Sequence, residues 1–189
     1  MLYFSSNAQE FRKFKTGLGF GVCVPSSNNG TGLILYSEPG YRITDVLLIN
    51  LRLETILPLT ANADAKSLPE GLGSLSTNAQ YYISKKNFRP FAGLGLGLFR
   101  LKTYEAEIYQ NGGASVSYGY ESKPGFYTRA GLDLGHLNLS IDYNFVTAST
   151  IEEINFANAT PEIVSKKSSN SYVGFRLGIS IGGGRISSK

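Results

Sequence analysis

Several residue types are scarce in this sequence, and each scarcity excludes a class of protein. Among 189 residues there is no Trp, and Cys, Met and His occur once each. A disulfide-stabilised domain is excluded, because the single cysteine, Cys23, has no partner within the chain. Cys23 also lies inside an alternating apolar pattern, which indicates a small buried residue and not a reactive thiol.

Charge and long apolar runs are scarce as well. Charged residues make up 17% of the chain, below the roughly 25% of soluble domains, and no basic run accompanies the net charge of +4. Nucleic acid is therefore not expected as a partner. No apolar run approaches the roughly 18 to 20 residues of a membrane helix. A hydropathy scan does not detect membrane strands, because their signal is short and alternating.

The residues that are abundant favour β-structure. The chain contains 22 glycines, 12 tyrosines and 11 phenylalanines, and its length suits a single domain. Residues 32–57 show the pattern most clearly. Odd positions from Leu47 to Leu57 are apolar except Thr55, whereas the even positions include Arg52 and Glu54. Because side chains alternate across a strand, one face is apolar and the other charged.

The same alternation predicts eight strands. They are Phe14–Val24, 32–43, Leu47–Leu57, Leu75–Ile83, Phe88–Leu101, Phe126–Leu134, Leu137–Phe145 and Tyr172–Ile181. The connections alternate in length, with a tight turn at Thr44-Asp45, a polar segment over 60–71, and long loops over 102–125 and 147–170. This sorting predicts an all-β fold, an eight-stranded antiparallel up-and-down transmembrane β-barrel with short periplasmic turns and longer extracellular loops. The alternative is a soluble β-barrel whose apolar face points inward.

The polar face of these strands carries a matched set of charges. Its four acids and four bases are Glu38, Arg42, Arg52, Glu54, Arg129, Asp133, Asp142 and Arg176. An eight-stranded barrel has an interior just wide enough for side chains to fill. Arginine, with its bidentate geometry, favours buried pairing over a solvated surface. We therefore predict that these eight residues form a charge network inside a closed lumen, while the apolar face meets lipid.

Other candidate sites are weaker. Glycines recur at every second position over 17–21 and 93–97, with no helix following, so a dinucleotide-binding loop is not expected. We interpret them as small lumen residues that admit Arg and Tyr from neighbouring strands. Carboxylates at Glu105, Glu107, Glu152 and Glu153 could bind a cation, although solvated loop charge is the favoured interpretation. We predict no cofactor and no metal.

Catalysis is not expected either. Membrane-embedded lipases and acylases need a nucleophile with a histidine partner, and omptin-like proteases need Asp and His at the outer rim. The one histidine, His136, lies in a predicted periplasmic turn, on the opposite side. The sequence therefore predicts a protein that is not an enzyme.

The first eight residues, MLYFSSNA, have a small-residue end typical of a secretory signal peptide. We predict that residues 1–8 are the remnant of such a signal, with cleavage after Ala8, and that residues 9–189 form one outer-membrane barrel domain. The alternative is an ordinary frayed N-terminus.

Three segments resemble a known family: EPGYRITDVLLINLRLE (38–54), FRPFAGLGLGLFRL (88–101) and YVGFRLGISIGGGR (172–185). They are similar to small outer-membrane β-barrel proteins of the Bacteroidetes type, near the OmpX, OmpW and OmpA-transmembrane-domain group, and the resemblance spans residues 11–185. Many such barrels end on an aromatic residue, whereas this chain ends GGGRISSK.

The resemblance implies residence in the gram-negative outer membrane, with outer-membrane lipid and the barrel-assembly machinery as partners. It leaves two functions open. One is a structural or surface-interaction barrel with a filled lumen, whose loops near 102–125 and 147–170 bind an extracellular ligand. The alternative is a narrow transporter or channel for small or hydrophobic solutes.

Overall fold

A computed structural model describes residues 11–26, 30–59, 73–108, 114–155 and 162–186. These residues form ten strands: β1 (Phe14–Pro25), β2 (Gly32–Arg42), β3 (Leu47–Pro58), β4 (Gly73–Tyr82), β5 (Phe88–Ile108), β6 (Ala114–Leu134), β7 (Leu137–Val146), β8 (Ser149–Asn155), β9 (Glu162–Ser168) and β10 (Tyr172–Gly182). None of the described residues belongs to a helix long and apolar enough to cross a membrane. The predicted signal remnant at 1–8 and the polar connection at 60–71 lie outside the described ranges.

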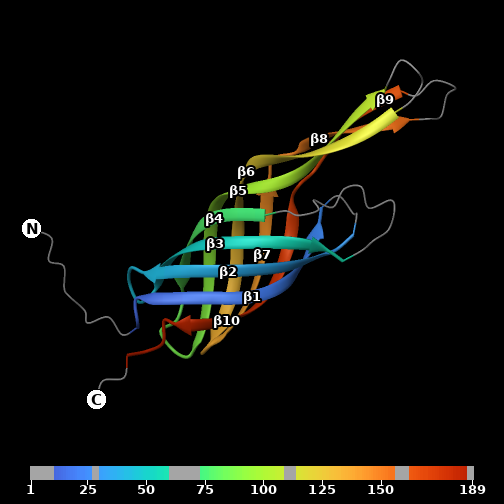
Figure 1. The fold of residues 1–189 in the computed structure, drawn as a ribbon. Helices are drawn as coiled ribbons and strands as arrows, with labels where there is room; N and C mark the ends of the chain where they lie inside the picture. Colours follow the sequence, from blue (N-terminus) through green and yellow to red (C-terminus); the bar gives the residue numbers. More distant parts are fainter. Residues whose placement is uncertain (1–10, 27–29, 60–72, 109–113, 156–161, 187–189) are drawn as a thin grey trace, which may run out of the picture.

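Eight of the strands form one closed antiparallel barrel (Figure 1), in the order β1-β10-β7-β6-β5-β4-β3-β2. Closure comes from the pairing of β1 with β10, which extends from Lys15 opposite Gly182 to Pro25 opposite Tyr172. The start of β1 and the end of β10 lie at the same end of the barrel as the β2–β3, β4–β5 and β6–β7 turns (Figure 1). We call this the turn end, and the opposite end the loop end. The predicted eight-stranded antiparallel barrel is confirmed.

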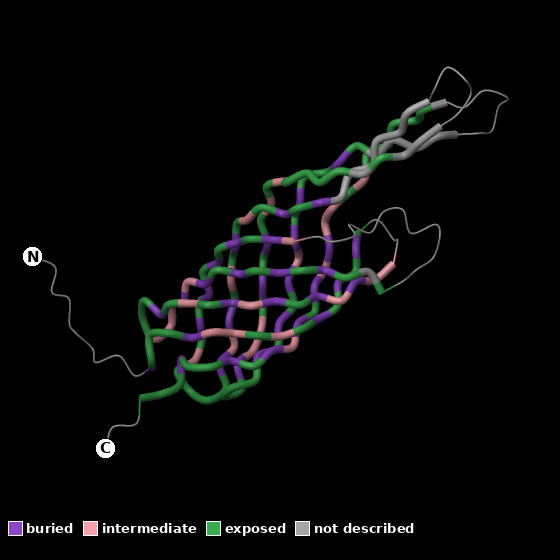
Figure 2. The backbone as a smooth tube through the Cα atoms, viewed as in Figure 1, coloured by how far each residue is buried: buried purple, intermediate pink, exposed green. Residues whose placement is uncertain are grey.

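Burial alternates along every barrel strand (Figure 2), in the direction that a lipid-facing barrel requires. On β3, Leu51 and Leu53 are 45% and 48% exposed, whereas Arg52 between them is 1% exposed. The polar residue is therefore inside and the leucines are outside. A soluble barrel with its apolar face inward would show the reverse.

Two predicted loops were wrong, and the first is the connection over 102–125. Strand β5 continues to Ile108 and β6 begins at Ala114, so that the two pair without interruption from Phe88 opposite Leu134 to Ile108 opposite Ala114. Only the parts of β5 and β6 nearer the turn end belong to the barrel wall, since β6 pairs with β7 no further than Gly125. A two-stranded ribbon beyond the wall has no lipid face, so polarity does not alternate along it as it does in the wall.

The second is the connection over 147–170, which contains the hairpin of β8 and β9. These strands pair with each other from Ser149 opposite Ser168 to Asn155 opposite Glu162, and β8 packs against the extension of β5. Together the extensions of β5 and β6 (101–108 and 114–124) and the β8–β9 hairpin project from the loop end (Figure 1). We call this projection the arm.

Candidate functional site

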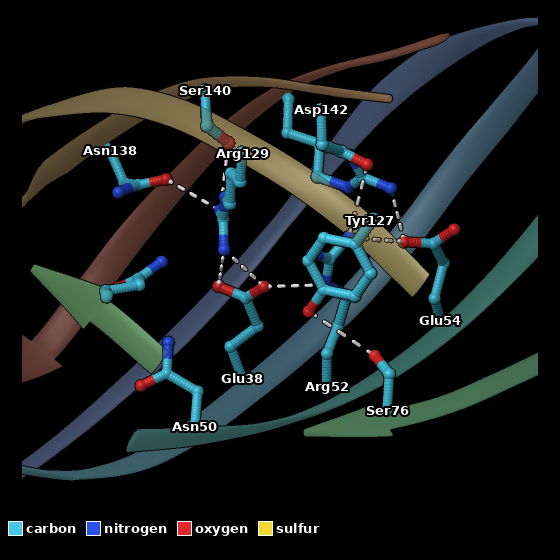
Figure 3. A network of polar contacts seen from close by, with 12 residues as sticks. Glu38, Asn50, Arg52, Glu54, Ser76, Tyr127, Arg129, Asn138, Ser140 and Asp142 are labelled. Atoms are coloured by element: carbon cyan, nitrogen blue, oxygen red, sulfur yellow. Dashed lines mark hydrogen bonds and ion pairs between the residues drawn. The ribbon is translucent and has the colours of Figure 1, made fainter. Parts of the chain in front are cut away.

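A network of six ionised side chains occupies the middle of the lumen (Figure 3). Its members are Glu38 on β2, Arg52 and Glu54 on β3, Arg129 on β6, Asp142 on β7 and Arg176 on β10. All six are buried, because each occupies an inward position of its strand. Five of the eight barrel strands thus contribute a charge to this network.

Arg129 connects β6 to the opposite wall. Its Nη1 donates to both carboxylate oxygens of Glu38, at 2.6 and 2.8 Å. Its Nη2 donates to Oγ of Ser140 at 2.8 Å and to Oδ1 of Asn138 at 3.4 Å. These charge-assisted hydrogen bonds pair the charges of Arg129 and Glu38 and are stronger than hydrogen bonds between neutral groups.

Arg52 joins the two halves of the network. Its Nε lies 3.0 Å from Oε1 of Glu38, while its Nη1 lies 3.5 Å from Oε2 of Glu54 and 3.4 Å from Oδ2 of Asp142. The face of the guanidinium covers the ring of Tyr127, with Cζ 3.9 Å from the ring centre. Arg52 therefore contacts three carboxylates and one aromatic face, a combination that the planar guanidinium permits.

Glu54 accepts hydrogen bonds on both of its oxygens. Arg176 donates from Nη2 to Oε2 at 2.6 Å, and the hydroxyl of Tyr172 donates to Oε1 at 2.7 Å. The other terminal nitrogen of Arg176 pairs with Asp142. Asn144 donates to the second oxygen of Asp142 at 2.5 Å. Each of the two carboxylates nearest the loop end thus has one neutral donor beside its arginines.

The charges of this network balance. Three arginines face three carboxylates, and each acid lies within ion-pair distance of at least two arginines. Removing an isolated ion from water costs several kcal/mol, and close pairing with further hydrogen bonds offsets that cost. The arrangement holds opposite walls together and fills the cross-section with paired side chains.

A second polar group lies nearer the turn end. Lys15 on β1 forms an ion pair with Asp133 on β6. The hydroxyl of Tyr82 donates to Oδ2 of Asp133 at 2.8 Å and accepts from Nζ of Lys15 at 3.0 Å. Asn138 donates to Oδ1 of Asp133 at 2.6 Å. Since Asn138 also accepts from Arg129, it links this group to the central network.

Phe11, just before β1, covers the turn end of the lumen. Its ring lies under the guanidinium groups of Arg89 and Arg42, whose Cζ atoms are 4.0 and 4.8 Å from the ring centre. The backbone N–H of Phe11 donates to Oδ1 of Asp45 at 3.2 Å, and Phe11 forms an isolated bridge with Arg185. The segments that flank the barrel strands are thereby held against its opening.

The loop end of the lumen is closed by apolar side chains. The buried cluster consists of Cys23, Ile34, Tyr36, Ile56, Phe99, Leu101, Tyr127, Val146 and Tyr172. Between the two polar groups lies a cavity of about 10 Å³, lined by residues that include Glu38, Asn50 and Gln80. A volume of this size holds about one water molecule. This cavity is therefore too small to hold a solute larger than water.

The eight charged residues predicted from the sequence are all buried inside the barrel. Six of them form the central network. Asp133 pairs instead with Lys15, and Arg42 stacks on Phe11 and Tyr82 nearer the turn end. The structure therefore divides the predicted set into two groups, linked through Asn138.

Two buried cations were missing from the predicted set: Lys15 and Arg89, which are 8% and 5% exposed. The alternation of side chains along their strands places both inward, since Lys15 lies on the same face of β1 as Cys23, and Arg89 on the same face of β5 as Phe99. The signal was therefore present in the alternation. Both residues lie near the ends of their strands, where a sequence pattern does not show whether the wall continues.

One alternating glycine has a clear role. A Cβ atom at Gly95 would collide with the ring of Tyr127 from the neighbouring strand β6. Tyr127 lies over Gly95 and supports Arg52 with its face. This contact agrees with the interpretation of Gly95 as a small lumen residue that admits a tyrosine.

The remaining candidates are His136, Cys23 and the four loop glutamates. His136 lies in the β6–β7 turn after Gly135, whose φ is 62°, and its Nδ1 donates to the carbonyl oxygen of Ser180 at 2.8 Å. Cys23 is buried. The described residues contain no group of three or more His, Cys, Asp or Glu that could hold a metal ion. The side chains of the four loop glutamates, Glu105, Glu107, Glu152 and Glu153, lie outside the described part of the protein.

Several solved structures are similar to this barrel. Neisserial surface protein A aligns with a TM-score of 0.59 and 16% identity, over 89% of this chain and 96% of that protein. The N-terminal barrel domain of OprF from Pseudomonas aeruginosa gives 0.53 and 13%, over 91% and 100%. The outer membrane protein OprG of the same organism gives 0.53 and 14%, over 92% and 98%. This chain has their fold.

By sequence, no protein family and no curated protein matches the chain. These three structures come from Neisseria and Pseudomonas, so the resemblance to barrels of the Bacteroidetes type stays a prediction. At these identities the likeness establishes the fold, while function has to be argued from the residues of this chain.

Proposed function

We propose that the protein is an integral barrel of the gram-negative outer membrane, whose lumen is closed and whose arm faces the cell exterior. The outer face supports membrane insertion. On β1 the outward side chains from Phe14 to Val24 are apolar apart from Thr16. This run of ten steps extends about 33 Å along the strand, or about 25 Å along the barrel axis at a tilt near 40°. That is the height of the apolar band of an outer-membrane barrel.

Exposed aromatic rings lie in both halves of this band. Phe14 and Tyr41 form an edge-to-face pair at the turn end, with ring centres 5.2 Å apart. Phe126 and Phe145 stack at 4.5 Å in the half nearer the loop end. Outer-membrane barrels carry aromatic girdles at both interfaces. OprG, which shares this fold, is itself an outer membrane protein, and this supports the same location here.

The balanced ion-pair network is the observation that supports a closed lumen. Opening a path past Arg52 would separate it from Glu38, Glu54 or Asp142, leaving charges unpaired in a narrow interior. The network holds the walls together and offers no nucleophile with a base. We therefore propose a structural and surface-interaction role, without catalysis.

The arm is the part that we propose meets an extracellular partner. It extends past the barrel wall and carries free strand edges, because among the residues that the structure describes β8 and β9 pair only with each other and β6 pairs with β7 no further than Gly125. On β9, Ile163 and Val164 are exposed beside Lys166 and Lys167. Unpaired strand edges with exposed apolar and charged side chains suit the addition of a strand from another protein.

The alternative function is a narrow transporter for small or hydrophobic solutes. The observation that favours it is the apolar lining of the loop end, where Ile34, Ile56, Phe99 and Leu101 face the lumen. A hydrophobic solute entering from outside would meet these side chains first. Transport would then require rearrangement of the charged network beneath them.

Single-channel recording in planar bilayers separates the two functions. Purified protein should insert and show no stable conductance steps of porin size. As a control, Arg52→Ala in the same preparation removes the central cation and its three carboxylate contacts, so leakage should increase. Stable, porin-sized steps from the parent protein would reject the closed lumen and favour transport.

Location and orientation can be tested with two matched lysine substitutions. In a Cys23→Ser background, Lys166→Cys places a thiol on the arm and Lys86→Cys places one in the β4–β5 turn; both side chains are exposed. A membrane-impermeant maleimide added to intact cells should label the first and not the second. After the outer membrane is permeabilised, both should react. If only Lys86→Cys were labelled in intact cells, the turn end would face the exterior and the proposed orientation would be wrong.

A further inference from the structure

An apolar groove with a cationic end crosses the outer wall from β1 to β6. It has a volume of about 830 Å³, and its apolar lining includes Leu53, Leu57, Leu75 and Leu98. Arg100 and Ser122 lie at one end. These side chains point away from the lumen, so the groove opens on the outer face of the barrel, although Glu54 of the ion-pair network also borders it.

The groove owes its depth to Gly73. In register, Gly73 lies between Thr55 of β3 and Arg100 of β5, on the outward face. A Cβ atom at this position would meet nothing nearer than the carbonyl oxygen of Glu54, at 4.0 Å. The missing side chain thus leaves a depression between rows of leucines, which a substitution can fill without backbone strain.

Arg100 is an exposed cation directed outward. Its Cζ lies 4.5 Å from the ring centre of Tyr120, and no carboxylate of the described residues pairs with it. Ser122, its register partner on β6, supplies a hydroxyl beside it. A guanidinium that is positioned by an aromatic ring but not neutralised retains its capacity to bind a phosphate with two hydrogen bonds.

Along the barrel axis, Arg100 lies at the level expected for the lipid headgroups. It lies twelve positions along β5 from the exposed Phe88 at the turn end. At about 3.3 Å per residue and a tilt near 40°, this separation is about 30 Å along the axis, close to the thickness of the hydrocarbon layer. The leucines of the groove then lie at the depth of the acyl chains.

A second groove on the barrel provides an internal comparison. It has a volume of about 700 Å³ and is lined by outward residues that include Phe20, Ala130, Leu139 and Phe175. The arginine that borders it, Arg176, points into the lumen and pairs there with Glu54. This groove therefore matches the first in size and apolar character but has no free cation at its end.

We propose that the groove at Gly73 is a binding site for one anionic, phosphate-bearing lipid of the leaflet at the loop end. Its acyl chain lies along the leucines and its phosphate is bound by Arg100 and Ser122. The inference rests on the proposed membrane insertion. Charge complementarity selects this occupant, because the cationic group of a zwitterionic lipid cancels its phosphate and leaves the positive charge of Arg100 without net compensation.

The absence of Trp from the chain allows a direct test. Leu53→Trp places one fluorophore in the groove, and Leu139→Trp places one in the comparison groove. Each protein is folded into phosphatidylcholine vesicles containing a minor fraction of brominated phosphatidylglycerol or brominated phosphatidylcholine. Quenching at Leu53→Trp should show about a fivefold preference for phosphatidylglycerol, the ratio expected for one basic residue near the surface. Quenching at Leu139→Trp should show no preference.

Two further variants, each combined with Leu53→Trp, test the site itself. Arg100→Gln should bring the preference to about one by removing the cation. Gly73→Leu should reduce it while Arg100 remains, because the depression is filled. Equal quenching by both lipids, or a preference that survives either substitution, would overturn the lipid site while the barrel still folds. Failure of the parent protein to fold into any vesicle would instead reject membrane insertion.

Discussion

Arg176 and Glu54 are joined across the lumen by a 2.6 Å hydrogen bond, although 122 positions separate them in the chain. Both side chains are completely buried. Their carboxylate and guanidinium also contact Arg52 and Asp142 respectively, so the pair is part of a balanced network and not an isolated contact. Removing one member leaves its partners charged without compensation.

Glu54→Gln should therefore destabilise the barrel by about 3–5 kcal/mol, because it leaves Arg52 and Arg176 short of one negative charge in the interior. The measurement is urea unfolding in lipid vesicles. Glu121→Gln is the control: Glu121 pairs with Lys123 at 2.8 Å, but its side chain is 46% exposed. That variant should cost less than about 1 kcal/mol. Equal effects from both would mean that the network contributes no more than a surface pair.

Substitutions at Leu51 test the direction of the outer face. Leu51→Arg introduces a charge on the lipid side near the middle of β3 and should cost about 2–4 kcal/mol. Leu51→Phe should cost less than about 1 kcal/mol, because lipid accommodates the larger ring, whereas a packed interior would lose about 1–3 kcal/mol. Folding free energies in vesicles distinguish the cases. A loss above about 2 kcal/mol for Leu51→Phe would contradict the lipid-facing assignment.

Glycine substitutions test the support of the network. Gly95→Ala should cost about 1–3 kcal/mol, because the new methyl group displaces Tyr127 from beneath Arg52. Gly73→Ala, which meets open space, should stay within about 1 kcal/mol of the parent. Both are read from vesicle unfolding curves. If the two variants were equally stable, the packing of Tyr127 on Gly95 would not contribute to the stability of the barrel.

The single cysteine reports on closure of the loop end. Cys23 is 2% exposed within the apolar cluster, so a water-soluble maleimide should label the folded barrel slowly. An opening free energy near 3 kcal/mol gives a rate about 100-fold below that of the unfolded chain. Ser26→Cys in a Cys23→Ser background, exposed just above β1, should react rapidly. Rapid labelling of Cys23 in the folded state would indicate that the loop end is open.

Much of the barrel could be predicted from the sequence, because the alternation of side chains along a strand depends only on neighbouring residues. Side chains on a strand alternate with a period of two, so the polarity of Leu51, Arg52 and Leu53 determines which faces outward once one face is assigned to lipid. The same parity placed the eight charged residues inside. The tight turns were readable from short polar segments such as Gly135-His136.

The tertiary structure decided the rest, because partners across a barrel depend on register and strand stagger, which no local pattern contains. The alternating pattern placed Asp133 inside but could not show that it pairs with Lys15 rather than with an arginine of the central network. It also missed the continuation of β5 to Ile108, since a ribbon outside the wall has no alternating polarity. The groove at Gly73 became visible only when three strands were aligned. The sequence alone thus determined the two faces of the wall, and the closed fold determined which residues meet on each.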